Sequence, residues 1–302
     1  MSRARSTECV DVRPVGGALG AEIGGIDASR AMAPGIADQI RAALDRHLVI
    51  FLRDQSVSLG QLKAFSTCFG ELTRVPYVGG LADHPQIIAV LKEADEHNIS
   101  TFGGTWHTDF SFLEHPPAAS ILFAEQVPAV GGDTLWANMY AAYEALSPGM
   151  QQTLAGLNAM HSGHVYGAAR PPANSATSQS IRISRNNPEA DVERAHPVVR
   201  VNPRTGRRAL YVNPVYTTRF EDMTQHESRG LLGFLYAHCT RAEFTCRLQW
   251  TPGTIAVWDN RYSLHMAVND YDGYRRLMYR TSTVGETPIG PAEASASSPG
   301  HG

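Results

Sequence analysis

The sequence predicts a mainly β fold with flanking helices, of the jelly-roll type. Short apolar or alternating runs recur along the chain between turn residues, which is typical of strands in a barrel or sandwich. A few segments with helical periodicity interrupt these runs. The chain has 302 residues, 43% of them hydrophobic, which is enough for one substantial core.

The first part of the chain is expected to mix strands and helices. Residues 11–27 alternate around glycines and predict two short strands joined by a turn. A helix over 36–44 leads into a strand at 48–52. Ser58-x-x-Gln61 is a capping-box pattern that predicts the start of a second helix, and residues 87–91 predict one more strand.

The β signal becomes stronger beyond residue 118, and helices interrupt it. Asn138 is expected to open one helix, and Ser147-Pro148 starts another with proline at its first position. Thr224-x-x-Glu227 predicts the capped start of a third. The strands expected in this part of the chain are 119–124, 133–137, 198–202, 209–213, 244–250, 254–258 and 276–284.

Two irregular stretches and the C-terminal end depart from this pattern. Residues 73–105 end in a polar, glycine-bounded run, and residues 163–195 are rich in Pro, Ser, Asn and Ala. We expect both to be inserts that act as active-site lids. The domain is expected to span residues 1–288, and the small-residue tail 289–302 is expected to be disordered.

The composition excludes several classes of protein. The 26 Lys and Arg residues are balanced by 29 Asp and Glu residues, so no nucleic-acid surface is indicated. No run approaches the roughly 18 apolar residues of a membrane span, and no secretory signal is indicated. The four cysteines form no CxxC pair, so we expect reduced thiols and a cytoplasmic protein.

A short motif suggests a metal site. His107 and Asp109 are two residues apart, so both can reach one ion from a strand or its end, and the distant His265 would complete the set. Two imidazoles and one carboxylate suit a divalent iron that keeps one face open. A lone histidine is more often a hydrogen-bonded polar residue, and this motif alone is weak evidence.

Two arginines strengthen the case. Arg276 and Arg280 share one face of a predicted strand, and burial there would be costly unless anions meet them. The planar guanidinium is suited to carboxylates. An edge strand whose arginines face water is the alternative.

At this point the chain resembles the iron(II)/2-oxoglutarate-dependent taurine dioxygenase and 2,4-dichlorophenoxyacetate dioxygenase family. The resemblance covers roughly residues 11 to 288. It rests on LGAEIGGID, HLVIFLRDQ, FGEL, WHTDFSF, GGDTLWANMYAAYEALS, HPVVRVNPRTGRRALYVN, TTRFEDM, WDNRYSLHMAVNDY and RRLMYRTSTVGE.

The resemblance implies a double-stranded β-helix, a role for each residue of the site, and the co-substrates 2-oxoglutarate and O2. His107, Asp109 and His265 match the iron(II) ligands. Thr134 and Arg276 match the residues that bind the distal carboxylate of 2-oxoglutarate. Arg280 matches a second arginine, near the substrate anion and the near end of 2-oxoglutarate. The products would be succinate, CO2 and an oxidised substrate, and a homo-oligomer is expected.

The sequence departs from taurine dioxygenase at the pocket rim. Val75, Val78 and Gly103 occupy the aligned positions of its histidine, tyrosine and asparagine. With Tyr77 and Phe110 they predict a more apolar rim. We therefore expect hydroxylation of a small organic acid next to a heteroatom, an aryloxyalkanoate or an alkyl sulfate or sulfonate, and other motifs resemble the aryloxyalkanoate branch. The alternatives are a specialised biosynthetic oxygenase, a zinc-dependent hydrolase that reuses the same ligands, and a cupin-like binding protein.

Overall fold

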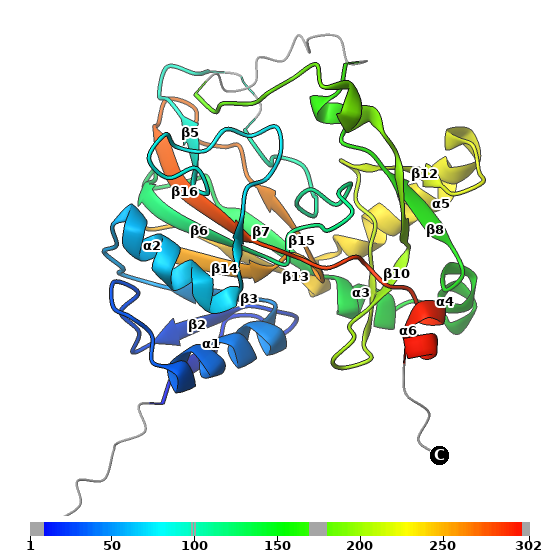
Figure 1. Ribbon diagram of the computed structural model, residues 1–302, viewed down its shortest axis with the longest axis horizontal. Coiled ribbons are helices and arrows are strands. Elements are labelled where there is room, and N and C mark those ends of the chain that lie inside the picture. The colour runs from blue at the N-terminus through cyan, green and yellow to red at the C-terminus, as the bar shows by residue number, and fades with distance from the viewer. Residues whose placement is uncertain (1–8, 98, 100, 169–179, 298–302) are drawn as a thin grey trace, which may run out of the picture.

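The computed structural model describes residues 9–97, 99, 101–168 and 180–297, and its core is built from β-sheets (Figure 1). The largest sheet has the strand order β1-β2-β3-β14-β6-β16-β4, with β5 also paired to β16. Its strands are β1 (Asp11–Pro14), β2 (Ala21–Gly24), β3 (Val49–Leu52), β4 (Leu72–Thr73), β5 (Ile88–Lys92), β6 (Ala119–Gln126), β14 (Ile255–Asp259) and β16 (Arg276–Thr283). Only the β2–β3 pair in this sheet is parallel among the described residues.

The remaining strands form three smaller sheets. Strands β7 (Thr134–Asn138), β13 (Thr245–Leu248) and β15 (Ser263–Ala267) pair in the order β13-β7-β15. Strands β8 (Asn158–His161), β9 (Arg194–Pro197) and β12 (Thr217–Phe220) pair in the order β12-β8-β9. Strands β10 (Val199–Val201) and β11 (Arg208–Leu210) form a hairpin pair.

Strict alternation of side chains gives the largest sheet two apolar faces. In β3, Val49 and Phe51 belong to one buried cluster, whereas Ile50 and Leu52 belong to another. The first cluster is the barrel interior, because it joins Phe51 to Trp136 of β7 with ring centroids 5.5 Å apart. Successive side chains of a strand point to opposite faces, so one strand can serve both clusters. The two sheets therefore face each other across a common core, as the predicted jelly roll requires.

Helices cover the outer face of the largest sheet. Helix α1 (Pro34–His47) and helix α2 (Leu59–Ser66) lie against it in Figure 1. Ile40 and Leu62 from these helices pack in the outer cluster with Ile50. The other helical elements are η1 (Thr67–Phe69), α3 (Met139–Glu144), α4 (Pro148–Leu154), η2 (His164–Tyr166), η3 (Pro188–Asp191), α5 (Gln225–Cys239), η4 (Ala242–Phe244) and α6 (Pro291–Ser297). In the part of the chain that the structure describes, no helix combines the length and apolar character needed to cross a membrane.

The predicted helix starts are confirmed. Ser58 and Thr224 each form a complete capping box, with Gln61 and with Glu227 respectively. Asn138 and Ser147 accept hydrogen bonds from the first backbone N–H groups of α3 and α4. These hydrogen bonds satisfy backbone donors that a helix start would otherwise leave unpaired. They join residues that are close in the sequence, so the sequence alone can predict them.

The structure differs from the expectation at the C-terminal end. Residues Pro291–Ser297 of the tail expected to be disordered form α6. Proline at the first position favours a helix start, and Glu293 Oε2 accepts a hydrogen bond from the Gly290 N–H at 2.8 Å. Upstream, the Ile289 carbonyl accepts a hydrogen bond from Val201 of β10. Residues 298–302 of the same tail lie outside the described residues.

Five strands were not predicted, namely β4, β8, β9, β12 and β15. They are short and carry several polar or charged residues, so their alternation is weak. Strand β9 and the short helices η2 and η3 overlap the stretch 163–195, and β5 lies within 73–105. Residues 169–179 of the first stretch lie outside the described residues. That these stretches act as lids stays a prediction.

The capping box of α5 gives a direct test of local stability. Thr224→Ala removes the side chain that accepts from the Glu227 N–H at 3.2 Å, and should lower the free energy of unfolding by about 1 kcal/mol. Thr224→Ser keeps the hydroxyl and should remain close to the wild type. Urea unfolding of the three proteins measures this, and equal stability of the two variants would contradict the role of the cap.

Candidate active site

Strand pairing brings His107 beside His265. The two residues form an isolated antiparallel bridge, in which each backbone N–H donates to the other's carbonyl at 3.0 Å and 2.9 Å. His265 lies in β15, and His107 precedes a turn that contains Asp109. The backbone hydrogen bonds therefore fix two residues 158 positions apart in the sequence, and His265 lies in a strand that was not among the predicted ones.

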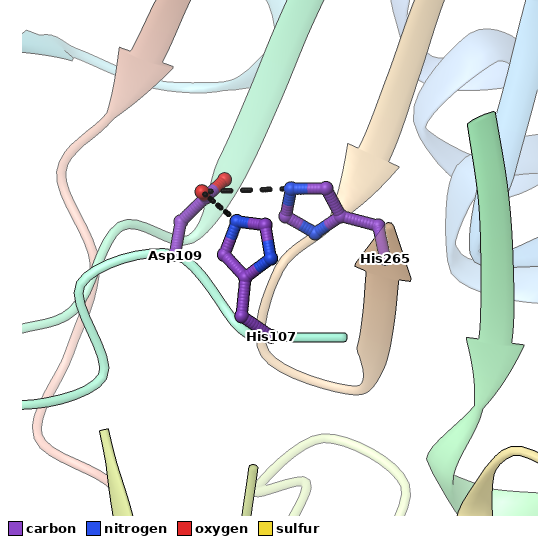
Figure 2. Close-up of side chains that lie close together, drawn as sticks. All are labelled: His107, Asp109 and His265. Atoms are coloured by element: carbon purple, nitrogen blue, oxygen red, sulfur yellow. Dashed lines mark ion pairs between the residues drawn. The ribbon is translucent and has the colours of Figure 1, made fainter. Parts of the chain in front are cut away.

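The side chains of His107, Asp109 and His265 converge, as Figure 2 shows. Asp109 Oδ1 lies 3.4 Å from His107 Nε2 and 3.5 Å from His265 Nε2. All three side chains are buried, and one ligand atom from each lies within 4.8 Å of the others. Among the described residues, these three side chains are the group of His, Cys, Asp or Glu whose ligand atoms lie close enough together to hold one metal ion.

The carboxylate of Asp109 divides its two oxygens between different partners. Oδ2 accepts a hydrogen bond from Ser120 Oγ at 2.9 Å and pairs with Arg280 Nη2 at 2.5 Å. Oδ1 is left to face the imidazoles. Burial opposes ionisation, but the Arg280 guanidinium holds the pKa of Asp109 well below its ordinary value. The group is therefore a carboxylate with one oxygen directed at the two histidines.

The backbone of Asp109 is held by Asn260, in the turn between β14 and β15. Asn260 Oδ1 accepts from the Asp109 N–H at 2.8 Å, and Asn260 Nδ2 donates to the Asp109 carbonyl at 3.0 Å. The same amide also donates to the Pro117 carbonyl at 2.9 Å. Two opposed hydrogen bonds to one residue fix its position, so Asp109 meets the histidines without depending on a regular strand.

The tautomer of His107 fits a metal ligand. Its Nδ1 lies 2.7 Å from the Thr105 carbonyl, which can only accept, so Nδ1 carries the hydrogen and Nε2 presents a lone pair. Burial, and then the neighbouring His107, lower the pKa of His265, which favours its neutral form. The His107 lone pair then faces a carboxylate oxygen. That arrangement is unfavourable alone and becomes favourable around a cation, and the N, N, O donor set suits divalent iron.

A second buried arginine lies on the face of β16 that carries Arg280. Arg276, Met278 and Arg280 are buried, whereas Leu277 and Tyr279 are partly exposed, which confirms the predicted shared face. Within the described residues, Arg276 Nε and Nη2 have no hydrogen-bond partner although the side chain is only 3% exposed. Buried guanidinium donors without partners are costly, so this arrangement suits an anion that approaches them.

The double-glycine turn before β7 lies against Arg276. Gly132 has a φ of +70°, and a Cβ there would approach Arg276 Nε to 3.2 Å. Thr134, two residues further, is buried and accepts a hydrogen bond from Trp250 Nε1 at 3.0 Å. The Thr134 hydroxyl hydrogen remains to donate. Thr134 pairs with Ala267 in β15, two residues from His265, so it shares the face of that histidine.

The predicted rim residues fall into two groups. Val75 and Val78 are buried in the same apolar cluster as Phe110, and Tyr77 packs partly buried against that cluster. Gly103 instead lies beside the histidines, because a Cβ there would be 3.2 Å from His107 Cε1. Its φ of +77° also favours glycine.

Several residues of the site carried no readable signal in the sequence. They are Ser120 and Asn260, which hold Asp109, the aromatic residues Phe112, Tyr166, Tyr216 and Trp258, and Tyr271, whose ring lies 5.7 Å from the Arg276 guanidinium. Asn260 follows the predicted strand 254–258, and only the fold shows which backbone it contacts.

Comparisons with known proteins agree with this geometry. The model of the family "Taurine catabolism dioxygenase TauD, TfdA family" matches residues 11–282. An alpha-ketoglutarate-dependent sulfate ester dioxygenase from Pseudomonas putida is 36% identical over 93% of this chain and 91% of its own length. An alkylsulfatase from Acinetobacter baylyi is 34% identical, covering 94% and 88% of the two chains.

Other relatives carry different names. Pentalenolactone F synthase from Streptomyces arenae is 31% identical over 95% of this chain and 99% of its own. The solved structure of a putative alpha-ketoglutarate-dependent taurine dioxygenase from Burkholderia xenovorans has a TM-score of 0.79 at 36% identity, covering 94% and 95% of the two chains. The chain therefore belongs to the TauD/TfdA family, and it is a 2-oxoglutarate-dependent dioxygenase of jelly-roll fold that uses iron(II), 2-oxoglutarate and O2.

Proposed function

We propose that His107, Asp109 and His265 hold the iron(II), and that the chain oxidises a small organic acid next to a heteroatom. The single observation that carries the first part is the approach of Asp109 Oδ1 to both Nε2 atoms, at 3.4 Å and 3.5 Å. When bound, the metal supplies the redox chemistry that couples loss of CO2 from 2-oxoglutarate to substrate oxidation. The protein contributes the ligands, the anion sites and the exclusion of water.

Loss of one imidazole tests the metal site. His265→Ala should weaken Mn(II) binding, measured by calorimetry, by more than about 100-fold, since even outer partners of metal ligands cost up to that factor. Substrate oxidation should be abolished. His238→Gln is the matched control, because His238 is buried and hydrogen-bonded to the Ala142 carbonyl elsewhere in the fold. Unchanged Mn(II) affinity in a folded His265→Ala protein would contradict the assignment of His265 as a metal ligand.

We propose that Arg276 and Thr134 bind the distal carboxylate of 2-oxoglutarate. The support is the pair of buried Arg276 donors without partners among the described residues, and the hydroxyl hydrogen that Thr134 has available. Gly132 leaves the space beside Arg276 open. A planar guanidinium can meet a carboxylate with two parallel hydrogen bonds.

Truncation of the arginine should affect one co-substrate selectively. Arg276→Ala should raise the KM for 2-oxoglutarate about 30-fold or more, because losing one partner of a buried charge pair costs at least about 2 kcal/mol. The KM for the organic acid should change far less. Arg247→Ala is the control, since Arg247 pairs with Asp133 close by but is largely exposed. An equal KM for 2-oxoglutarate in the two variants would contradict the proposed role of Arg276.

We propose that the substrate combines an anionic group with an apolar body. Arg280 Nη2 is engaged by Asp109 and Ser120, whereas its buried Nε has no partner among the described residues. The Arg280 guanidinium also lies 5.9 Å from the Phe110 ring. An anion beside an aromatic surface fits these contacts. The relatives named for sulfate esters and alkyl sulfates favour an alkyl sulfate as the leading substrate, with aryloxyalkanoates as the next class.

Charge on the substrate gives the test. Phenoxyacetate should be oxidised at least about tenfold more efficiently than phenoxyacetamide, since the neutral amide gives the buried Arg280 Nε no anionic partner. Hexyl sulfate should exceed taurine, because the apolar surroundings of Val75 and Val78 offer no partner to an ammonium group. Succinate formation measures both comparisons. Equal rates for acid and amide would contradict the anchoring role of Arg280, and a preference for taurine would contradict the apolar rim.

A biosynthetic oxidation is the second candidate, and the pentalenolactone F synthase relative favours it. An enzyme of that kind would oxidise neither phenoxyacetate nor hexyl sulfate. The zinc-hydrolase alternative is disfavoured because the relatives are named as dioxygenases. We propose in addition a cytoplasmic homo-oligomer, and the four free cysteines are compatible with a reducing compartment.

A further inference from the structure

The turn that follows the metal-site aspartate has a strained backbone. Phe110 has a φ of +49°, in the left-handed region that a bulky side chain rarely adopts. A hydrogen bond from the Leu113 N–H to the Phe110 carbonyl, 3.0 Å long, closes the turn. Such a conformation persists only where surrounding contacts over-determine it, and it is found most often at functional sites.

Ser111, the next residue, is fully buried and makes two side-chain hydrogen bonds. Its Oγ accepts from Asn213 Nδ2 at 2.9 Å and lies 2.9 Å from His161 Nδ1. The orientation of the Asn213 amide is fixed, because its Oδ1 accepts from the N–H groups of Val215 and Tyr216. The hydroxyl hydrogen of Ser111 is therefore free to donate to His161 Nδ1.

These bonds tie the strained turn to the sheet β12-β8-β9. His161 is the last residue of β8, and Asn213 lies before β12. His161 is fully buried, and burial, followed by the nearby His196, lowers its pKa well below the ordinary value. A neutral imidazole can accept a hydrogen bond at Nδ1. Asn213 can therefore donate to Ser111, and Ser111 to His161, without a charge on any of the three side chains.

The residues on both sides of Ser111 belong to one aromatic wall, made of Phe110, Phe112, Tyr166 and Tyr216. Phe110 stacks on Tyr166 at a centroid distance of 6.1 Å and also lies 5.9 Å from the Arg280 guanidinium. Phe112 lies 5.1 Å from Tyr216. Tyr216 in turn donates its backbone N–H to Asn213. The hydrogen-bond network of Asn213, Ser111 and His161 thus meets the wall in two places. Ser111 lies between Phe110 and Phe112 in the chain, and Asn213 accepts from Tyr216.

We propose that Ser111, held by His161 and Asn213, is a positioning residue that sets the aromatic wall against Arg280 and so determines how the apolar body of the substrate is bound. This inference rests on the proposed function, because it assumes that the aromatic wall contacts the apolar body of the substrate. Among the described residues, the Ser111 side chain hydrogen-bonds Asn213 and His161, and neither the metal ligands' side chains nor Arg280. Its effect should therefore fall on substrate binding and leave 2-oxoglutarate binding intact.

The decisive variant is Ser111→Ala, measured in protein loaded with Mn(II) and 2-oxoglutarate without oxygen. Calorimetry should show hexyl sulfate binding about tenfold more weakly, since small misplacements of positioning groups have effects of this order or larger. Affinity for 2-oxoglutarate should stay within about twofold of the wild type, and with iron more succinate should form per substrate molecule oxidised. Ser228→Ala is the matched control, because Ser228 is equally buried and hydrogen-bonds Phe220 and Thr224 outside the wall.

A crystal structure of Ser111→Ala supplies a readout that needs no substrate. Phe110 should leave its left-handed conformation or its ring should move away from Arg280. An unchanged Phe110, together with hexyl sulfate affinity within about twofold of the wild type, would overturn the proposal. If the wild-type protein binds no organic acid, the proposed function fails, and the position of Phe110 in the two structures still decides the role of Ser111.

A second pair of variants covers the case in which Ser111→Ala does not fold. His161→Asn offers an amide oxygen near the position of Nδ1, whereas His161→Leu offers no acceptor. Hexyl sulfate affinity should be retained in the first and lost in the second. Equal affinity in the two variants would overturn the proposal, because the hydrogen bond to Ser111 would then have no consequence for the wall.

Discussion

The site depends on a carboxylate that is buried and kept ionised. Asp109 is 2% exposed, and an isolated charge at such a position would be expensive. Arg280 and Ser120 take one oxygen, and Asn260 fixes the backbone on both its N–H and carbonyl sides. The other oxygen is therefore held toward the two histidines. In the proposed function the arginine that offsets this charge also contributes to the anion site, so metal binding and substrate binding would share one electrostatic element.

The fold explains why these groups can be brought together. Alternation in the large sheet directs Arg276 and Arg280 inward from β16, while the helices α1 and α2 cover the outer face. Strand β15 carries His265 on the facing sheet, and its bridge to His107 brings a distant loop into the core. The proposed site residues thus come from the loop that carries His107 and Asp109 and from β7, β15 and β16. The first insert contributes as well, because the Thr105 carbonyl lies 2.7 Å from His107 Nδ1.

Much of this could be predicted because the signals are local. The capping pairs Ser58 with Gln61 and Thr224 with Glu227 lie within single turns, and the alternation of β16 is visible in eight residues. The proposed ligand set could be predicted from the spacing of His107 and Asp109 and from the resemblance that matches His265, and its role in binding iron stays a prediction. Strand β15 was not predicted, because its pairing partners are remote in the sequence and its own pattern is short. Asn260, Ser111 and His161 were missed for the same reason: their roles consist of contacts across the fold.

The measurement that tests the central claim most directly is a crystal structure of the protein with iron(II) and 2-oxoglutarate, grown without oxygen. The account predicts an anomalous iron peak bound by His107 Nε2, Asp109 Oδ1 and His265 Nε2, with the distal carboxylate of 2-oxoglutarate on Arg276. Iron at any other group of side chains, or a 2-oxoglutarate carboxylate that does not reach Arg276, would contradict it.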